Sequence, residues 1–397
     1  MHHRRLFQNK KNHSQLTPLH ALFVIGFLFA INAALTAYIN SNFIGEFVSE
    51  RFIGILYVVG SAVSLMGLIW MPKFLRKFGN YKTILTGLSL AALALLVFAL
   101  TKSTTMIILF FIIHLGIKAV IFFGLDEFIE KYSKQSNTGK TRGLYLTALS
   151  LGWMISPFVS GMIVDRFGFQ AVYLTALVFS LLTILGVVFW FRDYKDPVYP
   201  KKVPLFDIAK KIFRRKNIYK VYRVNLLLQF FYAWMVVYMP IYLHQHLGFE
   251  WTTLGIMFAI MLLPFVLFEL PLGKVEDKKY GEKEIMSIGI IIIALSVVVI
   301  AFINSQNVIL WTALLFLTRT GAAMVEISIE TYFFKKVEGK ETDIISFYRN
   351  ASPIAYITAP LLVSGLLLLM PIQYTFIVLA IFVVTGLKFS TTLVDTK

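Results

Sequence analysis

The 397-residue chain is 58% hydrophobic, carries a formal net charge of +17 and contains no cysteine. A soluble fold is excluded, because one core of this size cannot hide so much apolar surface, and the charge then points to anionic lipid head groups rather than to nucleic acid. The lack of cysteine excludes a disulfide framework, a thiolate metal site and a catalytic thiol.

Long apolar segments recur along the chain, each close to the ~20 residues that cross a bilayer. Twelve can be marked, at 18–40, 52–72, 83–101, 106–128, 143–164, 169–191, 221–243, 252–272, 284–303, 307–333, 344–369 and 373–393. The first is too long for a signal peptide and no small-residue cleavage site follows it, so we expect a retained helix. Strand-like alternation is missing, which excludes an outer-membrane barrel. The sequence therefore predicts an all-α polytopic membrane protein with 12 transmembrane helices.

The basic residues are distributed unevenly between the two sides of these segments. Nearly all of the 38 Lys and Arg lie in the N-terminal tail, the even-numbered connections or the C-terminal end. The odd-numbered connections hold Arg51, Lys102 and Arg166. Because cytoplasmic loops retain Lys and Arg, we expect both termini in the cytoplasm and a multi-pass protein of a plasma membrane or bacterial inner membrane.

The longest polar stretch separates the segments into two sets of six. We expect a cytoplasmic tail at 1–17, six-helix bundles at 18–191 and 221–393, a cytoplasmic linker at 192–220 and a cytoplasmic end at 394–397. Apolar residues recur at helical spacing within the linker, at Leu205, Ile208, Ala209, Ile212 and Phe213. This pattern predicts an amphipathic helix on the cytoplasmic lipid surface, with a solvated basic linker as the alternative.

The two halves show signs of duplication. Similar residues stand 200 positions apart: Tyr38 with Tyr238, Asp126 with Glu326, and Glu130 with Glu330. A constant offset on both sides of a central linker predicts two pseudo-repeated six-helix bundles. Parallel halves of this kind place a solute site at their interface, near the middle of the membrane.

Two short basic loops resemble the loop motif of the major facilitator superfamily of transporters. The loop after the eighth segment keeps Gly273, Asp277, Lys278 and Gly281 of that motif, with one extra residue before the last glycine. The loop after the second segment keeps Lys77, Gly79 and Lys82 but has Arg76 at the aspartate position. A glycine lets helices approach closely, and a carboxylate suits a neighbouring helix N-terminus. By resemblance, such loops belong to the gate that closes the cytoplasmic mouth.

The fifth segment carries small residues at the spacing of the antiporter motif of the same family. These are Gly143, Gly152, Pro157 and Gly161, with serine at two of the motif's glycine positions. Small residues allow tight helix packing and proline bends the helix. The resemblance implies the 12-helix exporter and antiporter branch, and an ordinary helix interface is the alternative.

Two cations lie deep within apolar segments. Lys118 and Arg319 each stand about twelve residues into their segments, ~18 Å deep at 1.5 Å per residue. A cation there costs about 2.5–3.5 kcal/mol, so it should face water or a partner. We interpret the pair as attracting an anionic group of the solute. The alternatives are an ion pair with Glu269 and snorkelling to the interface.

Further polar residues complete the predicted substrate-binding set. In the family that the chain resembles, the first, fourth, seventh and tenth helices line the cavity. The predicted set is Asn32, Tyr38, His114, Lys118, Gln229, Tyr232 and Arg319. Such groups serve equally well as hydrogen-bonding glue between helices, which is the alternative for each neutral member.

Charges near the cytoplasmic ends predict a gate and a proton-coupling group. The gate candidates are Lys77, Gly79, Glu130, Arg142, Gly273, Asp277, Lys278, Glu326, Glu330 and Arg349, with ordinary interfacial charges as the alternative. The proton-coupling candidates are Glu269, Asp126 and His114. Glu269 is favoured, because burial would raise the pKa of its carboxyl.

The motifs of other function classes are missing. The sequence has no H-E-x-x-H, no G-x-S-x-G and no nucleotide-binding G-x-x-x-x-G-K-[ST] loop, so we expect no enzyme, metal site or cofactor. We predict a monomeric secondary transporter of a small amphipathic or anionic solute, working by alternating access as a proton-coupled exporter or antiporter in contact with membrane lipids. The alternatives are a lipid-translocating member of the same fold, an uptake symporter or uniporter for an organic anion, and a transporter-like receptor.

Overall fold

The structure, a computed structural model, describes residues 18–132, 138–196, 205–278, 281–337 and 342–394. The predicted tail at 1–17 lies outside these ranges. The described residues form helices, with these bounds: α1 Pro18–Ala37, α2 Asn40–Gly45, α3 Glu50–Leu100, α4 Thr104–Tyr132, α5 Thr138–Phe191, α6 Leu205–Arg214, α7 Lys216–Ile241, η2 Tyr242–His246, α8 Trp251–Lys278, α9 Glu282–Ile300, α10 Val308–Lys336, α11 Thr342–Arg349, α12 Ala351–Leu366, α13 Ile372–Val384 and α14 Leu387–Ser390.

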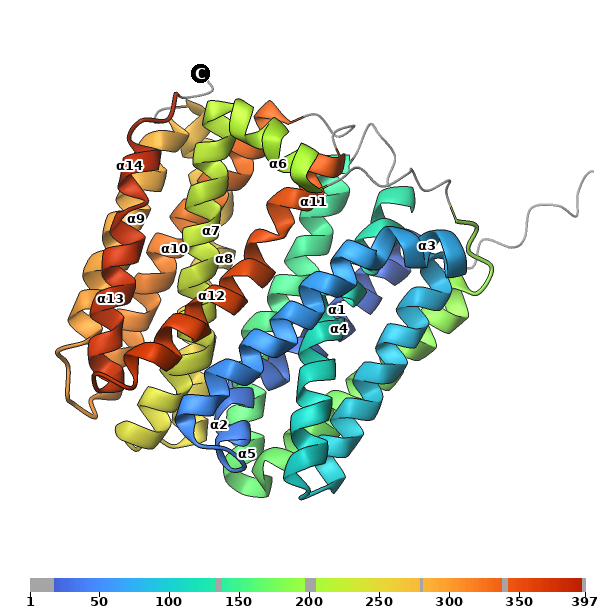
Figure 1. Ribbon diagram of the computed structural model, residues 1–397, viewed down its shortest axis with the longest axis horizontal. Helices are drawn as coiled ribbons and strands as arrows, with labels where there is room; N and C mark the ends of the chain where they lie inside the picture. The colour runs from blue at the N-terminus through green and yellow to red at the C-terminus, as the bar shows by residue number, and fades with distance from the viewer. Residues whose placement is uncertain (1–17, 133–137, 197–204, 279–280, 338–341, 395–397) are drawn as a thin grey trace, which may run out of the picture.

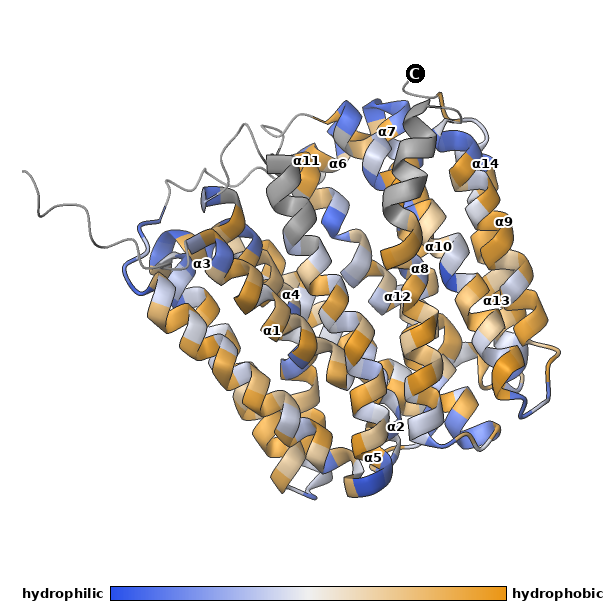
Figure 2. Ribbon diagram, turned by 180° about the vertical axis from the view of Figure 1, so that it is seen from behind, coloured by the Kyte–Doolittle hydropathy of each residue, from blue (hydrophilic) through white to orange (hydrophobic). Residues whose placement is uncertain are grey.

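Ten helical spans in the described residues are long and apolar enough to cross a membrane. The span Thr147–Phe191 has 45 residues and breaks at Gly168, so it crosses twice. The short helix α12 adds a further apolar segment of 16 residues. The predicted all-α membrane fold with twelve segments is therefore confirmed within the described part of the chain. Figure 2 shows hydrophobic residues along the helices and hydrophilic residues gathered towards their ends.

Two glycines reverse the chain within what is otherwise continuous helix. Gly79 has a φ of 77° and Gly168 a φ of 79°, values that residues with a Cβ rarely adopt. Each breaks its helix and returns the chain across the membrane with almost no loop. After Gly79 the backbone N–H of Asn80 donates to Oδ1 of Asp196 at 2.6 Å, which satisfies an otherwise unpaired group at a helix start.

The helices form two bundles, α1 to α5 in one and α7 to α14 in the other, as the colours of Figure 1 show. Helices α6, α11 and α14 lie at one end of the molecule, which we call the linker face. Helix α2 lies at the other end, which we call the distal face. Contacts between the bundles run mainly through α5 against α8 and α3 against α12.

The linker helix α6 is amphipathic, but its apolar face packs on protein. Ile208 and Ile212 are buried within the main hydrophobic core, and α6 contacts α11 and α7. Phe213 points away from that core with 61% of its surface exposed. The apolar face expected on the lipid surface is therefore occupied by α11 and α7, because they offer a better-matched apolar partner.

Glycines bring the two bundles into close contact near the distal face. A Cβ added to Gly161 on α5 would lie 2.2 Å from the backbone oxygen of Trp251 and 3.0 Å from Cα of Gly255 on α8. A Cβ on Gly54 of α3 would lie 2.1 Å from Oγ of Ser364 on α12. At Gly161 the two backbones approach more closely than a side chain allows, and a Cβ on Gly54 would also lie 2.9 Å from the backbone oxygen of Pro360.

Replacing Gly161 by Ala should therefore push α5 and α8 apart. We expect Gly161→Ala to lower the thermal unfolding temperature of the purified protein, because overpacking costs about 1–3 kcal/mol. Gly365→Ala is the matched control, since a Cβ there meets nothing within 4 Å. Equal unfolding temperatures for the two variants would contradict the proposed importance of this close contact.

Candidate functional site

Arg319 is a deeply buried cation in the middle of α10. Only 2% of its surface is exposed. Its guanidinium carbon lies 5.2 Å from the ring centroids of both Phe231 and Tyr232 on α7. Two aromatic faces therefore stabilise the positive charge by cation–π interaction. Its Nε–H has no hydrogen-bond acceptor within the described part of the chain.

Tyr232 connects this cation to an acid. Its hydroxyl donates to Oε2 of Glu326 at 2.6 Å, while its ring faces Arg319. Glu326 stands two helical turns from Arg319 on α10 and interacts with it electrostatically. Glu326 is one of the predicted gate residues, but its partners Tyr232 and Arg319 belong to this central site. Sequence spacing predicted the shared helix face of Arg319 and Glu326, and Tyr232 as a substrate-binding residue, but not the hydrogen bond by which Tyr232 joins the two charges.

Tyrosines from other helices complete the surroundings of Arg319. Tyr38, at the end of α1, and Tyr356, on α12, both interact electrostatically with the guanidinium. Tyr38 also packs on Phe258 of α8, with ring centroids 4.9 Å apart. We call Arg319, Phe231, Tyr232, Tyr38 and Tyr356 the aromatic cup. It draws on both bundles, since Tyr38 belongs to the first.

Lys118 and His114 lie inside the first bundle. Lys118 Nζ donates to the backbone oxygen of Ala33 on α1 at 3.4 Å, a partner within the span, which argues against snorkelling. His114 is 1% exposed and packs edge-on against Phe98 of α3, with centroids 5.8 Å apart. Neither ring nitrogen of His114 has a hydrogen-bond partner among the described residues.

Two further predicted substrate-binding residues, Asn32 and Gln229, differ in their surroundings. Asn32 is buried and its Nδ2 donates to the backbone oxygen of Ala176 on α5 at 3.0 Å. Asn32 therefore joins α1 to α5 through an interhelical hydrogen bond, the alternative role expected for the neutral members of the predicted set, and solute binding by Asn32 stays a prediction. Gln229 is half-buried on α7, one turn from the aromatic cup.

On the linker face an ion pair crosses between the bundles. Arg349, at the end of α11, donates through Nη1 to Oδ2 of Asp126 on α4. Glu330 lies beside Tyr348 of α11, and the exposed Lys77 ammonium stands 5.1 Å from the ring of Phe78. The candidates Glu130, Arg142, Gly143, Glu269, Gly273, Asp277 and Lys278 lie outside the residues whose side chains the structure describes.

The distal face is held by polar contacts that sequence reasoning did not anticipate. Asp165, near the end of the first half of α5, accepts hydrogen bonds from the backbone N–H groups of Trp251, at 3.0 Å, and Thr252. These are the free N–H groups at the start of α8, so the carboxylate of one bundle caps a helix of the other. The sequence signal was slight, a single Asp beside Arg166 in an otherwise uncharged stretch.

Two further contacts cross the distal face. Gln245 Nε2 donates to Oδ1 of Asn42 at 3.0 Å, and Nε2 of His246 lies 3.4 Å from Oε2 of Glu50. Together with the Asp165 cap they join η2 and α8 of the second bundle to α2, α3 and α5 of the first. We call these three contacts the distal lock.

Of the small residues predicted on the fifth segment, Gly152 and Gly161 pack tightly against neighbouring helices. A Cβ on Gly152 would lie 3.0 Å from Cβ of Ala30 on α1, while Gly161 faces Gly255 on α8. Ser156 Oγ donates to the backbone oxygen of Gly152 at 2.7 Å, near the helix-internal Pro157. One end of the motif, at Gly152, therefore packs on α1 of the same bundle, and the other end, at Gly161, packs on α8 of the other bundle.

The comparisons with known proteins agree with this architecture. The model of the Major Facilitator Superfamily matches residues 22–342 and 237–394. The chain belongs to the major facilitator superfamily. The family identified from the loop motifs is confirmed, and the protein is an integral multi-pass membrane transporter rather than an enzyme.

One curated relative is an uncharacterized MFS-type transporter of Methanocaldococcus jannaschii, 22% identical over 183 residues. The match spans 44% of this chain and 44% of that protein. Among solved structures, the nucleoside transporter NupG (D323A mutant) is similar with a TM-score of 0.74 and 13% identity, covering 96% of this chain and 100% of that one. An auto-inhibited POT family peptide transporter is similar with a TM-score of 0.78 and 10% identity, covering 96% and 98%. At these identities the likeness shows the fold alone.

Opening at the distal face can be measured with a single introduced cysteine, because the chain has no cysteine of its own. With Ser364→Cys as the single thiol at the contact between α12 and α3, labelling by a maleimide should be slow. Adding Asp165→Ala removes the cap on α8, worth about 1 kcal/mol, so labelling should become roughly fivefold faster. Glu250→Ala is the matched control, because this exposed acid immediately precedes α8. The distal lock is excluded as a closure if both backgrounds label at the same rate.

Proposed function

We propose that this transporter moves a small anionic or amphipathic solute and binds its anionic group at Arg319. The observation that carries the proposal is a guanidinium with 2% of its surface exposed and an Nε–H without an acceptor in the described part of the chain. Burying a cation without a full set of acceptors is costly, so the site is suited to a ligand that supplies them. The surrounding rings favour a solute that also has an apolar or aromatic part.

Glu326 is our candidate for the proton-carrying group. Its carboxylate and the solute's anionic group compete for the positive charge of Arg319, with Tyr232 between them. Protonation of Glu326 removes one competitor, so an anion and a proton should bind together. This arrangement favours movement of proton and anion in the same direction, the uptake symporter that the sequence left as an alternative.

Proton-coupled exchange is the second candidate, and a specific feature favours it. The helix-five residues Gly152, Pro157 and Gly161 resemble the motif of exporters and antiporters, and Gly161 lies at a contact between the bundles. In an antiporter the proton and the solute compete for one site, so they would oppose each other's binding. The two candidates differ in how the affinity for the solute changes with pH. It falls as pH rises for a symporter and rises with pH for an antiporter.

Alternating access would use the contacts at the two ends. The distal lock joins the bundles in the conformation described, and the Asp126–Arg349 pair joins them at the linker face. We propose that the linker face lies in the cytoplasm, because Lys and Arg concentrate there. The bundles predicted at 18–191 and 221–393, and a monomer as the transport unit, are part of the same proposal.

Neutralising the central cation tests the solute class. In a thermal-shift screen of purified protein, organic anions should stabilise the wild type and should have little effect on Arg319→Gln. Losing a charged hydrogen bond costs about 1.5–3 kcal/mol, so affinity should fall tenfold or more. Arg166→Gln, an exposed arginine on the distal face, is the control. Undiminished anion binding by Arg319→Gln would remove Arg319 from the solute site.

The pH dependence of binding tests the role of Glu326. If proton and anion bind together, the affinity for the stabilising anion should fall as pH rises, by up to tenfold per pH unit where Glu326 titrates. Glu326→Gln should abolish this slope, whereas Glu250→Gln should leave it unchanged. An affinity that rises with pH would instead support exchange, and an unchanged slope in Glu326→Gln would exclude this carboxyl.

A further inference from the structure

Lys118 is a second cation within the membrane, and it belongs to the other bundle from Arg319. It stands on α4, and its Nζ donates to the backbone oxygen of Ala33 on α1 at 3.4 Å. Among the described residues it forms no ion pair with an acid. A single long hydrogen bond cannot satisfy the three N–H donors of an ammonium group. At this depth the ammonium therefore calls for a further acceptor.

The free surface of Lys118 faces the interior of the protein rather than lipid. Leu109, which is 50% exposed, stands nine residues earlier and therefore on the opposite side of α4. Phe111 and Leu125 stand seven residues to either side of Lys118, on the same side of α4, and are 0% and 1% exposed. Lys118 itself is only partly buried. Space therefore remains beside its ammonium on the inner side of α4.

His114 adds unused hydrogen-bonding capacity at the same place. It stands one turn before Lys118 and interacts with it electrostatically. Its side chain is buried, and neither ring nitrogen has a hydrogen-bond partner among the described residues. An imidazole has at least one N–H donor, and burying it without a partner is costly. We call Lys118 and His114 the α4 site.

Helix α1 connects the α4 site to the aromatic cup. Ala33 accepts the hydrogen bond of Lys118, and Tyr38, five residues later, interacts electrostatically with Arg319. Five residues correspond to about 7.5 Å along a helix. The two cations are therefore close enough to meet the two ends of one small solute, and too far apart to share one small anionic group.

Tyr57 of α3 gives a second connection between the two places. Its ring packs edge-on against Phe111 of α4, with centroids 5.3 Å apart, and it interacts electrostatically with Tyr356 of the aromatic cup. Its hydroxyl is buried without a hydrogen-bond partner in the described part of the chain. An aromatic surface with an unused hydroxyl therefore lies between the α4 site and the cup.

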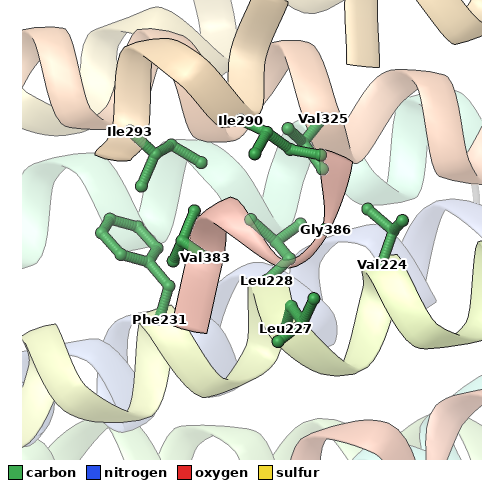
Figure 3. A pocket seen from close by; sticks show the side chains of 9 residues that line it. All are labelled: Val224, Leu227, Leu228, Phe231, Ile290, Ile293, Val325, Val383 and Gly386. Carbon is green, nitrogen blue, oxygen red and sulfur yellow. The ribbon is translucent and has the colours of Figure 1, made fainter. Parts of the chain in front are cut away.

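The opposite side of Arg319 offers nothing to an anion. Phe231, whose ring faces the guanidinium, also lines a small pocket inside the second bundle (Figure 3). Every residue that lines this pocket is apolar, among them Ile293 and Val325. A solute held at Arg319 finds its other polar contacts towards the first bundle, where Tyr38 and Lys118 lie.

We propose that the solute carries two anionic groups joined by an apolar spacer, and that the α4 site binds the second group while Arg319 binds the first. This inference rests on the proposed function, because it takes Arg319 as one end of the solute. The sequence interpretation gave both cations to one anionic group, whereas the structure gives each its own surroundings. A dianion joins a cation of one bundle to a cation of the other, so its binding favours the conformation in which the bundles close around it.

Matched probes with one and two charges test the second group. The probes are straight-chain dicarboxylates from succinate to sebacate and the monoamide of each, which has nearly the same shape and one charge fewer. In thermal-shift titrations, the wild type should bind the best dicarboxylate about tenfold more tightly than its monoamide, as expected for one charged hydrogen bond. Lys118→Gln should remove this preference and leave the monoamide affinity unchanged. Lys102→Gln, an exposed lysine before α4, should keep the preference.

The same titrations separate this inference from the proposed function. Arg319→Gln should weaken both probes, whereas Lys118→Gln should weaken the dicarboxylate alone and His114→Gln should reduce the preference by a smaller factor. Equal affinity of the wild type for every dicarboxylate and its monoamide would overturn the second anionic group, even if Lys118→Gln does not fold, and would leave Arg319 as an anion site. An equal loss of both probes in Lys118→Gln would overturn it as well. Binding of neither probe by the wild type would overturn both proposals.

Discussion

The rest of the structure depends on one buried positive charge. Arg319 lies where a cation is costly, and the protein stabilises it with the faces of Phe231 and Tyr232 rather than with a carboxylate in direct contact. Glu326 is kept one side chain away, behind the Tyr232 hydroxyl. A direct ion pair would satisfy the guanidinium, whereas this arrangement leaves part of its hydrogen-bonding capacity for a ligand.

The two ends of the molecule hold the bundles together by different chemistry. The distal face combines glycine-mediated backbone approach with a carboxylate capping a helix, contacts that form only at close range. The linker face uses the half-exposed pair of Arg349 and Asp126, and exposed pairs of this kind contribute little free energy. Rocking of one bundle against the other would open the contacts at one face and tighten those at the other face. A central site with side chains from both bundles, such as Tyr38 and Tyr232, would then change its access.

Much of the fold could be predicted from the sequence, because apolar length and basic asymmetry act locally. The twelve segments, their repetition and the family motifs are read from the local sequence alone. The partner of a side chain depends on which helices pack together, and the local sequence does not give this. Asn32 gave no sign that Ala176 would take its amide, and the roles of Asp165 and Asp196 as caps depend on which helix start lies opposite. Phe231 and Tyr356 were missed because aromatic residues abound in every span, so composition cannot single them out.

The most direct test of the account is an experimental structure of the protein with a stabilising organic anion bound. The account predicts the anionic group against the Arg319 guanidinium, with the rest of the solute between Tyr38, Tyr232 and Tyr356. It also predicts that Glu326 keeps its contact with Tyr232 rather than pairing with Arg319. An anion bound elsewhere, with Arg319 closed onto Glu326, would contradict the central claim.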